Sequence, residues 1–358
     1  MTNRRNFLTG ALAGFAFCGC GLPGAHAAPP PRKLPVTVNG KRAKTIDMHS
    51  HCLFQQTLDM MGPGAAPPPP VKGQKEAFIV IEERLKAMDA QAVDMEVLSV
   101  NPFWYRQTRD VSEKIVKTHN EKLAELCAAR PDRFAAFASL SLQFPDLAVQ
   151  ELETAIKKQG LKGAAIGDVV GDDDFSDPKF HPVWAKAEEL GAVLFIHPQG
   201  VPELAKRLQG NGWLGNTIGN PLGTTIALQH LIFQGTLDKF PGLKIVAAHG
   251  GGFLPSYADR SDHACFVMPA GCDPNIQLKK KPTQYLNQLY FDTLVFTSEA
   301  IRHLVAQVGA SQMVLGSDHP YPWQQHVVDH IFACTTLTDA QRVAILGGNA
   351  ARLLGIKA

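Results

Sequence analysis

The chain of 358 residues has little net charge, few cysteines and no apolar run of the length of a membrane span. Residues 1–27 hold two of its 35 basic residues and none of its 33 acidic ones. The remainder therefore carries 33 residues of each sign. This balance argues against nucleic acid as a partner, and it gives no reason to expect binding to a membrane surface.

Seven cysteines are present, five of them outside residues 1–27. An odd and sparse set of this kind does not predict a disulfide framework. Cys265 and Cys272 are close enough in sequence to pair in an oxidising compartment. Sequence spacing does not fix the geometry of a disulfide, so their pairing is left open at this point.

The first 27 residues are typical of a twin-arginine signal peptide. Arg4 and Arg5 precede an apolar run over Leu8–Phe17, and Ala25-His26-Ala27 resembles a cleavage site. We therefore predict an exported, periplasmic protein. A lipid-modified N-terminus at Cys18 or Cys20 is the alternative, although the residues before Cys20 fit such a site poorly.

A short N-terminal linker over residues 28–43 and one domain over residues 44–358 are expected to follow. The sequence contains no internal repeat and no clear second domain. A Pro-rich insertion, Gly62–Pro70, lies after the first expected strand and is either a lid or dimer element or a solvated loop. Residues Asp339–Leu354 predict a closing helix.

Short apolar runs alternate with helical patterns from Lys44 onward, which predicts a (β/α)8 TIM barrel of the α/β class. The eight expected strands are Thr45–His49, Glu96–Val100, Phe134–Ser139, Gly163–Ile166, Val193–His197, Ile245–His249, Leu289–Thr293 and Met313–Ser317. The expected helices include Ala77–Ala92, Val111–Ala129, Leu147–Gln159, Pro178–Leu190, Ala227–Lys239 and Ser298–Val308. The alternative is a doubly wound open sheet, which is weakened because no Gly-rich phosphate loop follows the first strand.

Polar residues end four of these strands. His49 and His51 are two residues apart on the first strand, so their side chains point to the same side and can share a metal ion. His197, His249 and Asp318 end three further strands. Because active sites of this barrel lie at the carboxyl ends of the strands, we expect these five residues to converge.

The chain resembles the amidohydrolase-related branch of the amidohydrolase superfamily, in particular enzymes of the 2-amino-3-carboxymuconate-6-semialdehyde decarboxylase type. The resemblance covers about Lys44 to Ile356. Its carrying segments are IDMHSH (46–51), MDAQAVDMEVLS (88–99), FHPVWAKAEELGAVLFIHP (180–198), KFPGLKIVAAHGGGFLP (239–255) and VLGSDHPYP (314–322).

The resemblance implies one divalent metal ion per chain, usually zinc, bound by four residues. These ligands map onto His49, His51, His197 and Asp318. It also implies that His249 is the catalytic base beside the metal, so that His249 and Asp318 are the expected catalytic residues. A catalytic zinc keeps an open position and lowers the pKa of bound water to about 7. We assign a structural role to Asp47, although some related decarboxylases have a Glu ligand at this position.

Substrate binding is less well defined by the sequence. Arg260 matches the spacing of a family arginine that reaches a neighbouring subunit's site, which implies a homodimer and a small-molecule substrate with a carboxylate. A surface salt bridge is the alternative for Arg260. The relatives' second arginine is missing from Val71–Ile81, so the substrate of that enzyme type is doubtful here. Asn101 and Trp104, which follow the second strand, are expected to line the substrate site.

Two reactions fit this site. Non-oxidative decarboxylation of an unsaturated or aromatic carboxylic acid is the preferred prediction. The alternative is a metal-dependent hydrolase or hydratase that acts on an amide, ester, lactone or double bond with the same metal-activated water. A binding protein without catalysis would be expected to lack ligands, whereas all four ligands and the base are present.

Overall fold

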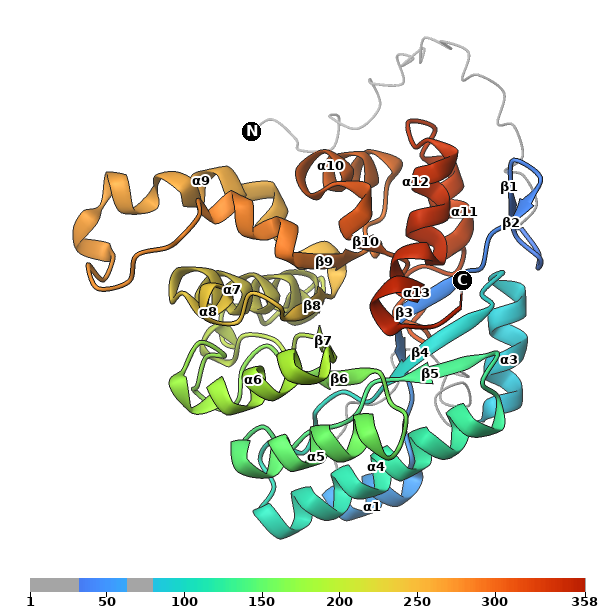
Figure 1. Ribbon diagram of the computed structural model, residues 1–358, viewed down its shortest axis with the longest axis horizontal. Helices are drawn as coiled ribbons and strands as arrows, with labels where there is room; N and C mark the ends of the chain where they lie inside the picture. The colour runs from blue at the N-terminus through green and yellow to red at the C-terminus, as the bar shows by residue number, and fades with distance from the viewer. Residues whose placement is uncertain (1–31, 63–79, 358) are drawn as a thin grey trace, which may run out of the picture. The chain divides into compact units, whose positions relative to one another are not determined.

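A barrel of parallel strands forms the centre of the protein in the computed structural model, which describes residues 32–62 and 80–357 (Figure 1). The predicted signal peptide and nearly all of the Pro-rich insertion lie outside these ranges. The barrel strands are β3 (Ile46–His51), β4 (Met95–Ser99), β5 (Phe134–Ala136), β6 (Gly163–Ile166), β7 (Val193–Ile196), β8 (Lys244–Ala247), β9 (Leu289–Asp292) and β10 (Met313–Val314).

The strands form two parallel sheets that meet edge to edge on both sides. One sheet has the order β3-β4-β5, and the other has the order β10-β9-β8-β7-β6. Parallel bridges join Ser50 to His319 and Ala138 to Ala164. The Met48 N–H also donates to the Leu315 carbonyl at 2.8 Å. The closed ring of eight strands confirms the predicted barrel and excludes the open sheet.

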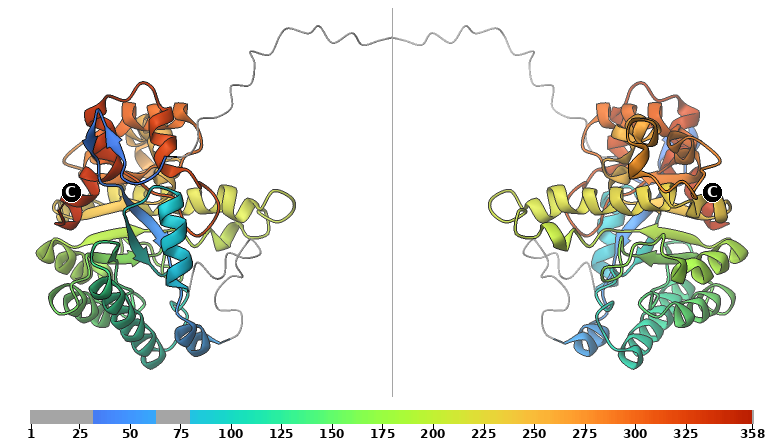
Figure 2. Two further views of the ribbon diagram at one scale, coloured as in Figure 1. Left: turned by 90° about the vertical axis from the view of Figure 1, so that its right-hand side faces the viewer. Right: turned by 90° about the vertical axis from the view of Figure 1, so that its left-hand side faces the viewer.

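Helices surround the strands, as the side views show (Figure 2). They are α1 (Gln55–Met61), α3 (Ile81–Ala90), α4 (Arg109–Ala129), α5 (Pro145–Lys157), α6 (His181–Leu190), α7 (Asn220–Phe233), α8 (Thr236–Lys239), α9 (Leu254–Val267), α10 (Ser298–Val308), α11 (Val327–Ala333), α12 (Asp339–Val343) and α13 (Asn349–Leu354). The helix predicted over Ala227–Lys239 is two helices, because Gly235 has a φ of 70° and a left-handed residue ends an α-helix. In the described ranges, no helix is both long and apolar enough to cross a membrane.

The barrel interior is filled by alternate residues of the strands. Val193 and Phe195 of β7 belong to this inner cluster, whereas Leu194 and Ile196 belong to the outer layer between strands and helices. Helix α13 contributes Ala350, Ala351, Leu353 and Leu354 to the inner cluster. Because α13 packs on this cluster, the helix predicted to close the chain also helps to fill the barrel.

The segment expected to be a linker contains a β-hairpin in its described part. Strands β1 (Thr37–Val38) and β2 (Lys41–Arg42) pair antiparallel. Val36 and Val38 are buried at 2% and 4% exposure, so this segment packs on the domain.

A disulfide joins Cys265 and Cys272, which answers the question that the sequence left open. Cys265 lies near the end of α9. The neighbouring Phe266 and Val267 are 85% and 71% exposed. The disulfide therefore fixes a loop at an exposed, apolar end of α9.

Candidate active site

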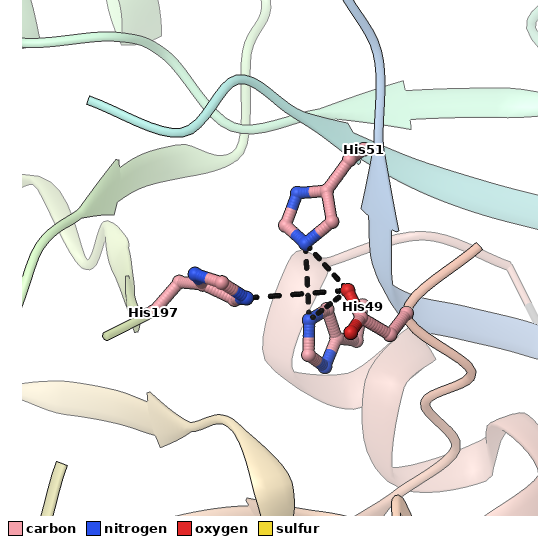
Figure 3. Close-up of side chains that lie close together, drawn as sticks. His49, His51 and His197 are labelled. Atoms are coloured by element: carbon pink, nitrogen blue, oxygen red, sulfur yellow. Dashed lines mark hydrogen bonds and ion pairs between the residues drawn. The ribbon is translucent and has the colours of Figure 1, made fainter. Parts of the chain in front are cut away.

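Three histidines and one aspartate meet at the carboxyl ends of the strands. His49, His51, His197 and Asp318 are all buried, and each offers one ligand atom within 4.8 Å of the others. The Nε2 atoms of His49 and His51 are 3.1 Å apart. Figure 3 shows the imidazoles pointing toward one another from two different strands. The structure thus brings together the four predicted ligands of a divalent metal.

An irregularity in β3 turns its two histidines into the barrel. Ile46 and Met48 belong to the inner cluster, so in a regular strand His49 and His51 would face the outer helices. The register of β3 against β4 shifts between Asp47 and Ser50. Such a bulge re-aims the side chains that follow it, and the His49 ring accordingly lies 5.0 Å from that of Phe195 in the interior.

Hydrogen bonds orient both histidines. The Nδ1 of His49 lies 2.6 Å from Asp292 Oδ2, and the Nδ1 of His51 lies 3.0 Å from Ser99 Oγ. With its proton on Nδ1, each imidazole presents a lone pair on Nε2. These two lone pairs face each other and Asp318 Oδ1, at 3.1 and 2.9 Å. A cation between them resolves this otherwise repulsive arrangement, so the donor set fits a metal.

The charges of the ligands also fit a cation. Burial lowers the pKa of His197 well below its usual range and lowers that of His51 to about 4, so both are neutral donors. Burial opposes ionisation of Asp318, but the charge of His49 outweighs it and holds the pKa of Asp318 well below its usual range. Burial opposes protonation of His49, but Asp318 and Asp292 outweigh it and raise the pKa of His49 to about 10, so this imidazole carries the positive charge of the cluster. Binding of a metal would release that proton, because a ligating imidazole is neutral.

Asp292 was not identified from the sequence, although it ends β9 as the predicted ligands end their strands. It is fully buried and accepts from the backbone N–H groups of His249, Gly250 and Leu294 at 2.8 to 3.0 Å. Burial opposes its ionisation, but the bond from His49 and nearby histidine charge lower the pKa of Asp292. Asp292 therefore orients a metal ligand and the His249 turn together.

His249 lies beside the cluster without belonging to it. Its Nε2 is 3.8 Å from Asp318 Oδ2, and its ring centre is 5.3 Å from that of His197. Its φ of 56° is left-handed, which is uncommon outside glycine. Gly252 is required in this turn, since a Cβ there would lie 2.1 Å from the Pro221 carbonyl. The turn thus directs the His249 imidazole, which is not a ligand, toward the metal site, where the predicted base is expected to lie.

A buried charge network supports the end of β3 from behind, and the sequence did not predict it. Arg84 of α3 is 1% exposed, and its Nη1 lies 2.6 Å from Glu96 Oε2 and 2.9 Å from Ser50 Oγ. Arg84 also donates to the His51 carbonyl. His319 Nδ1 lies 2.8 Å from the other oxygen of Glu96. The network fixes the backbone between the two metal-binding histidines.

The other predicted site residues divide into two groups. Asn101 lines a cavity of about 540 Å³ that also exposes His197 and Asp318. Trp104, in contrast, is fully buried and donates its Nε1–H to the Leu140 carbonyl, so its prediction as a substrate-binding residue was wrong. Phe103, the neighbour of Trp104, does line the cavity. Trp213 and Trp323 add an aromatic wall, and their rings stack at 5.7 Å with 9° between their planes.

Arg260 and Asp47 do not reach this cavity. Arg260 is exposed on α9 and makes no hydrogen bond or ion pair with any described residue of its own chain. Asp47 accepts from the backbone N–H groups of His49 and Ser317 at 3.0 and 3.1 Å. Burial, and then the charge of Glu96, raise the pKa of Asp47 to about 7. Its carboxyl group joins β3 to the loop after β10, which agrees with the structural role assigned to it.

Fold and site together define a metal-dependent TIM-barrel enzyme with a single metal centre. The family model described as Amidohydrolase matches residues 46–356, and the chain belongs to this family, within its decarboxylase branch. It is 30% identical over 276 residues to 2-amino-3-carboxymuconate-6-semialdehyde decarboxylase of Dictyostelium discoideum, covering 76% of each chain. It is 32% identical over 294 residues to gamma-resorcylate decarboxylase of Rhizobium radiobacter, covering 78% of this chain and 88% of that one.

A solved structure supports the same conclusion. Dihydroxybenzoic acid decarboxylase of Polaromonas sp. JS666, with bound manganese and 2-nitroresorcinol, superimposes with a TM-score of 0.76 at 25% identity. The match covers 87% of this chain and 97% of that one. The fold and the divalent metal site are therefore those of the family, and zinc as the particular metal is a separate question.

Proposed function

We propose that the protein is a mononuclear-metal decarboxylase that removes the carboxylate of an aromatic or unsaturated carboxylic acid without oxidation. The observation that carries the proposal is the cluster of four ligands beside His249, with His197 and Asp318 of the cluster exposed to a cavity that has aromatic walls. The decarboxylases similar to this chain, named above, support the same reaction class.

His49, His51, His197 and Asp318 would hold the metal, which supplies a positive charge that binds the substrate's carboxylate and neighbouring oxygen. Trp213 and Trp323 offer flat faces to the ring. The side chain of His249 is 16% exposed, so its imidazole can give a proton to the ring carbon that bears the carboxylate. The bond to the carboxyl carbon then breaks, its electron pair stays with the ring, and carbon dioxide leaves.

We propose zinc as the native metal, because imidazole nitrogen is a preferred zinc ligand in catalytic sites. Manganese, present in the similar structure, is the competitor. Metal analysis of the purified protein should find about one divalent ion per chain, since one set of four ligands is present. If the analysis finds one manganese ion per chain, zinc is wrong as the native metal, and the proposed decarboxylation is unaffected.

We also propose that the enzyme is a homodimer in which Arg260 acts in the partner's site. Its exposure and its lack of a partner among the described residues of its own chain support this. Replacement of Arg260 by Ala should raise KM with little effect on metal content. An unchanged KM, or a monomer in light scattering, would contradict the proposal.

The test of the reaction is a substrate screen with the metal-loaded protein. Hydroxybenzoic acids, muconate-type acids, lactones and amides are incubated with the zinc and manganese forms, and gas release and product mass are measured. Decarboxylation should give carbon dioxide and a product about 44 mass units lighter than the acid, because one carbon and two oxygens are lost. Hydrolysed or hydrated products without carbon dioxide would instead establish the alternative activity.

A further inference from the structure

Two cavities lie beside the candidate active site. The first, of about 540 Å³, exposes the ligands His197 and Asp318. The second, of about 350 Å³, exposes His249. Asn216, Asn220 and Trp323 line both. His249 Nε2 in the second cavity is 3.8 Å from Asp318 Oδ2 in the first, so the two cavities are neighbours at the proposed proton donor.

The first chamber is suited to a flat, polar ring. Asn101, Gln199 and Asn216 offer neutral amide groups, and the stacked indoles of Trp213 and Trp323 form a wall. Trp213 has a φ of 51°, an unfavourable backbone conformation for a bulky residue. Such strain is kept only where the surrounding structure imposes it, and it is concentrated at functional sites. The acid and its ring are therefore placed in this chamber.

The second chamber has a different lining. Apart from His249, Thr217 and the shared asparagines, its wall is mostly apolar, with Pro221, Phe253, Leu294, Val295, Phe296 and Ala300. None of its lining residues in the described part of the chain is Asp, Glu, Lys or Arg. A volume of about 350 Å³ is within the range of small-molecule sites.

This lining selects against polar groups and favours apolar ones. A hydroxyl or carboxylate placed against the apolar walls would lose water without gaining a partner there, which is costly. An alkyl group would instead displace water that the apolar walls hold poorly, at a gain of about threefold to fourfold in binding for each buried CH₂.

We propose that the second chamber is a binding subsite for an uncharged alkyl substituent longer than methyl, carried by the ring position next to the reacting carbon. The inference rests on the proposed decarboxylation and names its substrate class: 2-hydroxybenzoic acids with a 6-alkyl chain. The position follows from His249, which lines this chamber and is the proposed proton donor to the ring carbon that loses its carboxylate.

The test uses the full metal-loaded chain and four acids: 2-hydroxybenzoate and its 6-methyl, 6-propyl and 6-pentyl derivatives. The value of kcat/KM should rise with chain length by about threefold to fourfold per CH₂ at most. Ala300→Leu fills the chamber from α10 and should lower kcat/KM for the pentyl acid by about tenfold or more, with 2-hydroxybenzoate within about twofold. Ala306→Leu is the matched control, because Ala306 is exposed on the same helix.

A second variant, tested by ligand binding, examines the subsite without measuring turnover. Phe296 is 59% exposed, so Phe296→Ala removes a wall of the chamber with little risk to folding. It should weaken binding of 3-pentylphenol, the product, more than binding of phenol, as followed by tryptophan fluorescence.

The possible results separate the subsite from the reaction. Release of carbon dioxide from all four acids with no dependence on chain length or on Ala300→Leu would overturn the subsite alone. Equal losses for all acids in Ala300→Leu would do the same. No carbon dioxide from these four acids, with release from another acid of the screen described above, would overturn the substrate class and leave the reaction in place. No carbon dioxide from any acid of that screen would overturn the proposed function, and with it the role of the chamber.

Discussion

At the scale of single residues, His249 is separable from metal binding, because it is not one of the four clustered ligands and its Nε2 is 3.8 Å from Asp318 Oδ2. We expect His249→Asn to keep one metal per chain and to lower kcat by about 10²- to 10⁴-fold, the usual contribution of a general acid or base. Asn is chosen because it tolerates the left-handed φ of 56°. Unchanged turnover, with metal measured by mass spectrometry, would remove His249 from the proton transfer.

Asp292 acts on the site through another residue. Asp292→Asn would place an NH₂ group against either His49 or the N–H groups that Asp292 now accepts. We expect metal affinity to fall by about 10- to 100-fold, as is usual when the partner of a ligating histidine is lost. Competition with a chelator measures this. Wild-type metal affinity in a correctly folded variant would contradict the positioning role.

Residue types at strand ends were enough to predict that His49, His51, His197, His249 and Asp318 converge, whereas the division into four ligands and a base came from the family resemblance. Asp292 also ends its strand, but the sequence does not distinguish an acid that binds the metal from an acid that orients a metal-binding histidine. Trp104 was wrongly predicted because an aromatic residue after a strand can turn into the core, where its Nε1–H meets the Leu140 carbonyl. The aromatic wall arises from residues 213 and 323, which only the folded chain brings together.

At the scale of elements, continuous apolar runs made all eight barrel strands predictable, to within a few residues at each end. The shift in β3 between Asp47 and Ser50 was not predictable, since it depends on the bonds of Asp47 to the loop after β10. This irregularity decides which side the histidines face. A regular strand with the same residues would have placed them outside the barrel.

Helix α5 contains a carboxyl group that should make stability depend on pH. Glu151 accepts from Ser141 N–H at 2.7 Å and from Ser141 Oγ at 2.8 Å. Burial raises the pKa of Glu151 to about 7 from 4.5. The folded state therefore holds this proton more tightly than the unfolded chain, and the stabilisation that it gives below about pH 4.5 is lost as the pH rises through about 7.

Glu151→Gln tests this effect, because an uncharged amide can keep both contacts with Ser141. The fall in the free energy of unfolding between pH 4.5 and 7 should shrink by at most on the order of 3 kcal/mol. Urea unfolding at both ends of this range measures it. Glu153→Gln is the control, because Glu153 is on the same helix and pairs with Lys157 at the surface. Equal pH dependence in the wild type and Glu151→Gln would refute the assignment.

At the scale of the whole molecule, export remains a proposal. The Cys265–Cys272 disulfide supports it, because such bonds persist in oxidising compartments. A reporter fused to residues 1–40 should be exported, and replacement of Arg4 and Arg5 by Lys should stop this export. Fractionation of the cells measures both. Export that continues in the double variant would exclude strict dependence on the twin arginines.

The barrel closes between β3 and β10, and the metal ligands lie on both sides of that seam. His49 and His51 belong to the three-stranded sheet, His197 follows a strand of the five-stranded sheet, and Asp318 follows β10. An ion held by all four would join the two sheets, so its binding free energy would also oppose their separation. Chelation should then speed amide exchange at Met48 and Asp318, whose N–H groups cross the seam. Loss of the metal would thus first weaken the contact between β3 and β10. The rate at which the enzyme unfolds in the cell would therefore depend on the supply of metal.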